Sequence, residues 1–444
     1  MNTTHSHTDL AEQIVAKVHE RSGQLVGLLS ELVRIPSVNP VFPDSLPRGE
    51  EQLQLHLRER LQRSGFQCEL FEPDPERLER HRGRPGFQDG RSFEHRPNLA
   101  GTLRGEGAGR SLMLASHIDV VGVSADESWQ RDPFGGEVSD GYVWGRGSAD
   151  MKGGTACLLA AVEALLDLGL RPGGDLIWAS VVDEETGGMG TLAVVDRGYT
   201  ADAAFMPEPT RRRIVPMCRG ILWGELVIQG RSSHIEIPQA DWREGGAVDA
   251  IAKARLMLDA LDELNADWAQ RPAKQHPLLP VPNQLFVSMI AAGQHPSSWA
   301  EQARITFDIQ YTANEADADG VGGEVKREVQ EFVAARAAGD EWLAEHPPLL
   351  RWTVDANPGE VAMSDPLLRE LQRSCVRLGL DPSPDGTGFH TDSSILIAAG
   401  IPTVVFGPGE PDDAHQVDER VAVSDLLDVT AALALTMAEW GEWK

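Results

Sequence analysis

Short apolar runs that end in acidic residues or histidines constrain the fold of this chain more than any other feature. In the first half of the sequence these runs lie at 99–103, 111–115 and 175–182, and a helical pattern covers 155–168. Apolar runs that are flanked by turn residues and joined by helices are typical of buried, mostly parallel strands in an α/β sheet. Because ligands of such sheets bind beyond the carboxyl ends of the strands, the residues after each run are candidate site residues.

The pattern in the second half of the sequence predicts a smaller domain that is inserted into the α/β domain. Strand and helix patterns follow one another in the order β-α-β-β-α-β, at 222–229, 247–264, 285–290, 304–311, 321–337 and 349–354. This order matches a ferredoxin-like split unit. We therefore expect one α/β domain formed by 1–215 and 359–444, in which the apolar run 403–406 rejoins the first sheet, and an inserted domain at 216–358.

Two N-terminal stretches, 11–32 and 52–64, are predicted to be helices. The charged segment 72–97 contains prolines and glycines and is predicted to be a loop or insertion without an assigned role. Its histidines, His81 and His95, are expected to be solvated.

The acidic composition excludes several partners. The net charge is −28, from 68 acidic and 40 basic residues, and such a surface repels nucleic acid and anionic lipid. We find neither a signal peptide nor an apolar run of about 18 residues, so no membrane span is expected. The four cysteines form no C-x-x-C pair, which favours a reducing, cytoplasmic location.

The first candidate ligand is His117, in LMLASHIDVV. Residues two apart in a strand lie on one face, so Asp119 is placed to orient the imidazole of a metal-binding His117. A purely structural histidine–aspartate pair is the alternative. In GRGSADMKGG, Asp150 lies in a glycine-rich loop before a helix, and its two carboxylate oxygens suit it to bridge two ions. A plain turn is the alternative there, since the phosphate-binding pattern G-x-x-x-x-G-K-[ST] is absent.

Three further segments place acids or a histidine after apolar runs. Adjacent acids, Asp183, Glu184 and Glu185, repel one another unless cations or protons offset their charge, although a solvated acidic turn is the alternative. Glu208 lies between two prolines, and His415 lies in DDAHQVDE. Histidines and carboxylates without cysteine suit zinc, cobalt or manganese.

The series SHIDVV, GRGSADMKGG, DEETGG, PEPT and DDAHQVDE resembles the co-catalytic zinc exopeptidase family over nearly the whole chain. That family includes aminoacylase, acetylornithine deacetylase, succinyl-diaminopimelate desuccinylase and the glutamate carboxypeptidases. The resemblance implies that His117, Asp150 and Glu208 bind one zinc ion. It implies that Asp150, Glu185 and His415 bind the other.

The resemblance also implies roles outside the ligand set. Glu184 would be the general base and Asp119 would orient a ligand, with a cis peptide bond between Asp150 and Met151. The inserted domain would act as a lid and dimerisation domain. Its His234 would stabilise the oxyanion, often from the partner subunit, and Arg219 matches a position that contacts substrate in relatives.

Two departures from the family pattern bear on the substrate. Gln310 stands where many relatives have an arginine that binds a carboxylate, and GTGFHTDSS lacks an arginine that some relatives place after its aspartate. His390 and Asp392 are expected to line the pocket, with helix capping by Thr391 and Asp392 as the alternative.

The sequence therefore predicts a metal-dependent hydrolase that cleaves the amide bond of a small N-acylated amine or amino acid. An intracellular dipeptidase or carboxypeptidase, or a metal-binding relative without turnover, is the alternative. The predicted cofactors are two divalent ions, zinc first and cobalt or manganese otherwise. A small N-acylated substrate and a homodimer through the lid are the expected partners.

Overall fold

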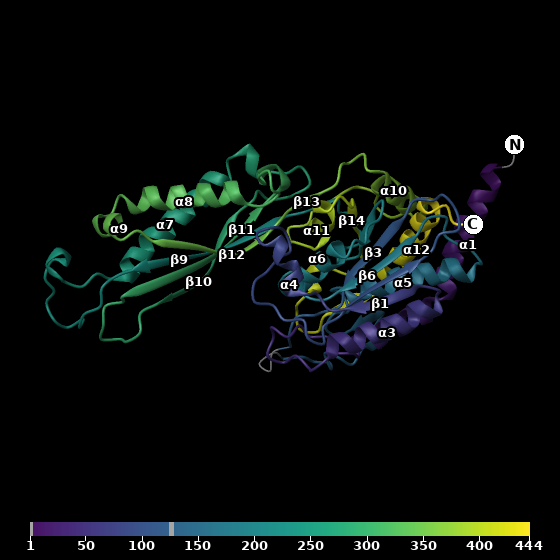
Figure 1. Cartoon of the computed structure of the whole chain (residues 1–444), viewed down its shortest axis with the longest axis horizontal. Helices are drawn as coiled ribbons and strands as arrows, with labels where there is room; N and C mark the ends of the chain where they lie inside the picture. Colours follow the sequence, from purple (N-terminus) through teal and green to yellow (C-terminus); the bar gives the residue numbers. More distant parts are fainter. Residues whose placement is uncertain (1–2, 124–127) are drawn as a thin grey trace. The chain divides into compact units, whose positions relative to one another are not determined.

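The computed structural model describes residues 3–123 and 128–444 and divides into two compact units (Figure 1). The first unit comprises 1–217, 360–387 and 391–444, and the second comprises 218–359 and 388–390.

A six-stranded sheet with the order β1-β2-β6-β3-β7-β14 forms the centre of the first unit. Its strands are β1 (Gln67–Phe71), β2 (Asn98–Leu103), β3 (Leu112–His117), β6 (Leu176–Val181), β7 (Ala204–Met206) and β14 (Thr403–Val405). Strands β6, β3, β7 and β14 pair in parallel, whereas β2 runs antiparallel to both of its neighbours. The predicted α/β class with a mostly parallel sheet is confirmed, and the run at 403–406 does rejoin the sheet.

Helices cover both faces of this sheet, which explains why its strands are apolar on both sides. Leu112 and Leu114 of β3 belong to the core that includes α5 and α12, while Met113 and Ala115 belong to the core that includes α6 and α11. The helices of this unit are α1 (Thr3–Glu20), α2 (Ser22–Val33), α3 (Gly49–Arg63), α4 (Pro75–Leu78), α5 (Lys152–Asp167), α6 (Met189–Asp196), α10 (Pro366–Leu378), α11 (Ser393–Ala398) and α12 (Val423–Trp440).

Short elements complete the first unit. Strands β4 (Glu137–Ser139), β5 (Tyr142–Trp144) and β15 (Arg420–Ala422) form a three-stranded sheet, and 3₁₀ turns lie at η1 (Glu79–His81), η2 (Glu184–Thr186) and η6 (Pro411–Asp413). Strands β8 (Met217–Cys218) and β13 (Gly359–Glu360) lie where the chain passes from one unit to the other.

Two N-terminal features differ from the sequence prediction. The single helix expected over 11–32 is interrupted at Arg21, whose guanidinium pairs with Glu163 and Asp167 of α5. The segment 72–97 is not simply a loop, because it contains α4 and η1.

Segment 72–97 has a defined structure because its side chains contact a buried carboxylate. Asp74 caps α4 by accepting hydrogen bonds from two backbone amides, and Pro75 starts the helix. His81, expected to be solvated, contacts the buried carboxylate of Asp196 at 2.7 Å, and Arg80 pairs with the same carboxylate. The segment is therefore fixed to α6.

The second unit is a four-stranded antiparallel sheet with the order β10-β11-β9-β12. Its elements are β9 (Gly220–Gln229), η3 (Trp242–Glu244), α7 (Ala250–Trp268), η4 (Pro272–Lys274), β10 (Leu285–Ala292), β11 (Gln302–Tyr311), η5 (Ala313–Glu315), α8 (Gly323–Ala337), α9 (Glu341–Glu345) and β12 (Leu349–Ala356). Along β11, Ile305 and Phe307 pack with residues of α7 and α8, while Arg304 on the other face is exposed. The order and the one-sided helix layer confirm the ferredoxin-like prediction.

Within residues 3–123 and 128–444, we find no helix that combines the length and apolar composition needed to cross a membrane.

Candidate metal centre

The carboxyl ends of three adjacent parallel strands bring the predicted site residues to one edge of the sheet. His117 ends β3, the acidic turn η2 follows β6, and Glu208 follows β7. His415 approaches from the loop after η6, and Asp150 precedes α5. Segments far apart in the sequence therefore meet where the strand-end rule expects a site.

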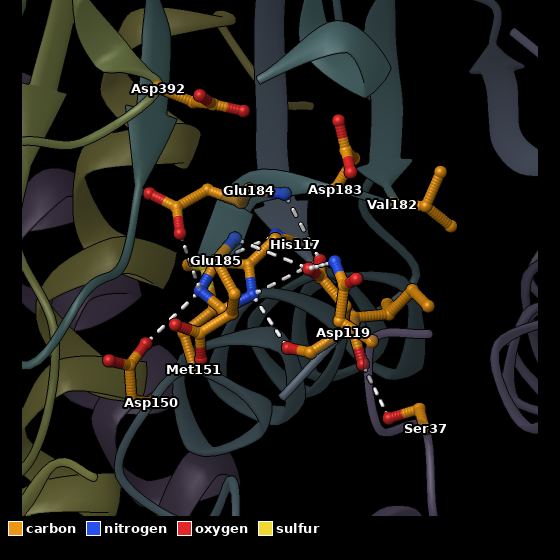
Figure 2. A network of polar contacts seen from close by, with 12 residues as sticks. Ser37, His117, Asp119, Asp150, Met151, Val182, Asp183, Glu184, Glu185 and Asp392 are labelled. Carbon is orange, nitrogen blue, oxygen red and sulfur yellow. Dashed lines mark hydrogen bonds and ion pairs between the residues drawn. The ribbon is translucent and has the colours of Figure 1, made fainter. Parts of the chain in front are cut away.

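Asp150 lies between two histidines, with one carboxylate oxygen facing each. Figure 2 shows Asp150 next to His117. Its Oδ1 is 3.1 Å from His117 Nε2, and its Oδ2 is 3.3 Å from His415 Nε2. Although burial opposes it, the two histidines hold the pKa of Asp150 below its usual range, so the carboxylate is ionised. This is the geometry that a bridging carboxylate requires.

Three glutamates complete the cluster. Glu185 Oε2 lies 2.9 Å from His415 Nε2, and Glu208 Oε2 lies 3.6 Å from His117 Nε2. Glu184 Oε2 is farther, at 3.9 Å from His117 Nε2. Candidate ligand atoms of His117, Asp150 and Glu185 all lie within 4.8 Å of one another.

Glu419 stabilises the loop that carries Asp150. Glu419 Oε1 accepts hydrogen bonds from the backbone amides of Ala149 (2.9 Å) and Asp150 (3.1 Å), and its Oε2 pairs with Arg146 at 2.7 Å. The peptide bond between Asp150 and Met151 is cis, as expected from the family resemblance.

Asp119 contacts the neighbouring acidic turn as well as His117. The Nδ1 of His117 lies 2.9 Å from the backbone carbonyl oxygen of Asp119, and the carboxylate oxygen is farther away at 3.8 Å. That carboxylate accepts hydrogen bonds from the backbone amides of Glu184 (3.3 Å) and Glu185 (3.2 Å). One residue thus fixes the imidazole through its carbonyl group and the acidic turn through its side chain.

Buried carboxylate oxygens without hydrogen-bond partners indicate whether these residues fit divalent cations. Burial raises the pKa of Glu185 to about 7, with a further contribution from Asp150. Burial also raises the pKa of Glu208 to about 7, against the opposing effect of His117. Among the described residues, Glu185 Oε1 and Glu208 Oε1 have no hydrogen-bond partner although both atoms are buried. Buried carboxylate oxygens in this state are costly unless cations or protons compensate them, so the residues fit a divalent metal site.

Asp392, expected to line the pocket, belongs to the first unit. Its carboxylate accepts a hydrogen bond from Thr191 Oγ1 at 2.6 Å, and its negative charge contributes to raising the pKa of Glu184. Asp392 precedes α11 but makes no capping hydrogen bond, whereas Thr391 Oγ1 accepts a hydrogen bond from the backbone amide of Ser393, the first residue of α11, at 3.3 Å.

The other residues singled out from the sequence lie in the second unit, and their roles stay predictions. His234 is exposed, and its Nδ1 accepts a hydrogen bond from the amide of Glu236 at 3.3 Å. Arg219 is buried and donates to Gln310 Oε1 at 2.6 Å. His390 Nδ1 contacts the carbonyl oxygen of Arg219 at 3.2 Å, and burial lowers the pKa of its imidazole to about 4, so the ring is neutral.

Sequence reasoning missed two residues that support the cluster. Asn39 donates to Asp119 Oδ2 at 2.8 Å and to Thr186 Oγ1 at 3.0 Å, and no motif indicated it. Glu419 belongs to the quoted DDAHQVDE segment, but its contact with Asp150 became visible only in the folded chain.

Comparisons with known proteins identify the family of this chain. The family model described as peptidase family M20/M25/M40 matches residues 113–439. The chain belongs to this family. It is 30% identical over 449 residues, covering 97% of each chain, to an N-formyl-4-amino-5-aminomethyl-2-methylpyrimidine deformylase from Halalkalibacterium halodurans. It is also 30% identical over 434 residues, covering 93% of this chain and 96% of the relative, to a succinyl-diaminopimelate desuccinylase from Methylobacterium radiotolerans.

Solved structures share the fold. The dipeptidase Dug1p from Saccharomyces cerevisiae matches with a TM-score of 0.72 at 15% identity, covering 97% of this chain and 98% of that one. Human carnosine dipeptidase 1 matches with a TM-score of 0.71 at 17% identity, covering 98% and 99%. The M20 membership confirms the predicted family and the prediction of a metal-dependent hydrolase.

Proposed function

We propose that this M20 enzyme hydrolyses the N-acyl bond of small amines that lack a free carboxylate, with N-formyl amines preferred. The observation that carries the proposal is the similarity, over nearly the full length of both chains, to a relative named as the deformylase of an aminomethylpyrimidine. The desuccinylase relative matches over a similar length, and its name specifies a succinylated amino acid.

The second unit supports a substrate without a carboxylate. Gln310 replaces the arginine of many relatives, and the nearby guanidinium of Arg219 is already engaged. It donates to Gln310 Oε1 and to the carbonyl oxygen of Val281, both at 2.6 Å, and the residue is only 2% exposed. Because both terminal nitrogens of Arg219 are paired within the protein, a bidentate contact with a substrate carboxylate would have to break these hydrogen bonds.

The residues of the first unit fit amide hydrolysis. Two divalent ions, bound as the family resemblance implies, would lower the pKa of a water molecule and polarise the acyl carbonyl group. Glu184 Oε2 would accept the proton of the attacking water and deliver it to the nitrogen of the departing amine. His234 would donate to the developing oxyanion. Zinc is the proposed metal, with cobalt or manganese as alternatives, because the ligands are imidazoles and carboxylates.

A substrate screen tests this proposal. We expect N-formyl aminomethylpyrimidine and N-formylbenzylamine to be hydrolysed with a kcat/KM at least about tenfold higher than N-succinyl-diaminopimelate, N-acetylornithine and dipeptides, which corresponds to roughly 1.4 kcal/mol. Released amine is measured with zinc- and cobalt-loaded enzyme, and chelator-treated enzyme is the blank. A preference for dipeptides or acyl amino acids would contradict the proposed substrate class.

We also propose that the second unit pairs two chains. Its edge strand β10 exposes Phe286, Met289 and Ile290, with exposed fractions of 46%, 63% and 55%. An exposed apolar edge strand is suited to pairing with a second strand. We expect light scattering to give the mass of two chains for the wild type and of one for Ile290→Glu. Val376→Glu, at a similarly exposed position on α10, is the control, and a monomeric wild type would contradict the proposal.

A cytoplasmic location is proposed from the thiols. No disulfide joins Cys68, Cys157, Cys218 and Cys375, and burial raises the pKa of the Cys157 and Cys375 thiols to about 12. Free thiols persist in reducing compartments. Recovery of the native protein in an extracellular fraction would contradict this location.

A further inference from the structure

Segment 72–97, to which the proposed reaction assigns no role, brings an arginine to the acidic turn of the site. Arg91 Nη2 donates to the backbone carbonyl oxygen of Thr186, the last residue of η2. Its Nη1 lies 3.8 Å from Asp183 Oδ1, and its Nε donates to Gln88 Oε1 at 3.0 Å. One guanidinium therefore contacts the turn at both ends.

Asp183 needs this positive charge. Its side chain is fully buried and its backbone has a φ of 74°, so the residue is held in a left-handed conformation. Its Oδ1 atom lies 3.8 Å from Arg91 Nη1 and 3.6 Å from Arg96 Nη2. Arg96 is shared, because it also binds both carboxylate oxygens of Glu50, at 2.5 and 3.0 Å. Arg91 is therefore the cation near Asp183 that does not also pair with Glu50.

The same segment packs directly against the glycines that follow the turn. A Cβ atom at Gly86 would lie 3.3 Å from the carbonyl oxygen of Gly188 and 2.8 Å from Ile395 Cδ1. A Cβ atom at Gly187 would lie 3.0 Å from Gln88 Cδ. Such close approaches leave the turn little room to move while the segment stays in place.

Asp119 holds the opposite side of the turn, because its carboxylate accepts hydrogen bonds from the backbone amides of Glu184 and Glu185. Asp119, which follows β3, therefore holds the backbone amides of the turn. Arg91 of segment 72–97 holds the carbonyl group of the last residue of the turn, Thr186. Glu184 lies between these two anchors.

We propose that Arg91 is a positioning residue for Glu184, holding the turn 183–186 so that the Glu184 carboxylate stays within reach of the attacking water. This inference rests on the proposed function, in which Glu184 is the general base. Segment 72–97 then acts as a brace for the catalytic turn.

Binding of a substrate anion by Arg91 is the competing role, and kinetics separate the two. A residue that binds substrate changes KM, whereas one that positions the base changes kcat. The guanidinium already contacts three protein groups, Gln88, Asp183 and Thr186, and the side chain is 17% exposed. These contacts favour positioning.

The test compares Arg91→Ala and Arg91→Lys with Arg80→Ala. Arg80 lies in the same segment and pairs with Asp196, which Arg77 and His81 also contact, so its variant removes one ion pair while the segment stays attached to α6. We expect Arg91→Ala to lower kcat by about a hundredfold, since a displacement near 1 Å can cost that much, with KM changed by less than about twofold. Arg91→Lys keeps the charge but cannot contact Asp183 and Thr186 together, so an intermediate kcat is expected. Arg80→Ala should match the wild type.

Hydrogen exchange gives a readout that does not depend on substrate. Faster exchange of the amides in 183–188 in Arg91→Ala, with wild-type rates in Arg80→Ala, supports the brace even if no tested amide is hydrolysed, in which case the proposed function alone fails. Unchanged exchange and unchanged kcat would overturn the inference. A raised KM with unchanged kcat would also overturn it, by assigning Arg91 to the substrate. If Arg91→Ala does not fold, the exchange rates and kcat of Arg91→Lys decide the question in the same way.

Discussion

Replacing Glu184 with glutamine is expected to lower kcat by about 10²–10⁴-fold, roughly 3–5 kcal/mol of transition-state stabilisation, while the protein keeps its metal. The amide has nearly the shape of the carboxylate but cannot accept the proton of the attacking water. Burial raises the pKa of Glu184 well above its usual value, with His117 opposing and Glu208 and Asp392 reinforcing the rise, which favours proton uptake at this position. Its carboxylate lies 3.9 Å from His117 Nε2, farther than those of Asp150 (3.1 Å) and Glu208 (3.6 Å).

The decisive measurement pairs turnover with metal content for Glu184→Gln. Glu59→Gln, an exposed glutamate on α3, is the matched control and should retain both. Full turnover in Glu184→Gln would remove the base assignment. Loss of metal from the same variant would instead assign Glu184 to the ligand set.

The position of the site was predictable because it depends on strand ends. His117 and Glu208 lie at the ends of apolar runs, and the carboxyl ends of parallel strands meet at one edge of a sheet. The structure shows that β3 and β7 are parallel neighbours. The contact of His415 with Asp150 was reached through the family resemblance, since these residues come from loops whose paths the apolar pattern does not determine.

Contacts that support the site were beyond sequence reasoning for a physical reason. Arg91 and Thr186 are separated by 95 positions, and Glu419 and Ala149 by 270, so each contact depends on how a loop closes. Periodicity describes regular elements and carries no information on loop closure. The same limit applies to segment 72–97, whose charged composition hid its anchor on Asp196.

The hydrogen-bond partner of His117 Nδ1 shows another limit of prediction from the sequence. A spacing of two predicts that His117 and Asp119 share a face, provided that the strand continues. β3 ends at His117, so the backbone changes direction and presents the carbonyl group of Asp119 at 2.9 Å. The freed carboxylate binds the amides of the acidic turn, and this links two segments that carry proposed catalytic and metal-binding residues.

Removing the Asp150 carboxylate is expected to abolish binding of both ions, because each of its oxygens faces a different histidine. Asp150→Ala should raise the dissociation constants of both ions by at least about a hundredfold and reduce turnover to the level of chelator-treated enzyme. His415→Ala removes a proposed ligand of one ion only. Its metal content should therefore fall from two equivalents to one.

Metal analysis after equilibrium dialysis against zinc separates these outcomes. His295→Ala, at an exposed histidine of the second unit, should retain two equivalents. Two ions retained by Asp150→Ala would exclude a bridging role, and a wild type that binds one ion would exclude a dinuclear centre. The buried oxygens of Glu185 and Glu208 make the dinuclear result the expected one, since a single ion near His117 would leave the carboxylate next to His415 uncompensated.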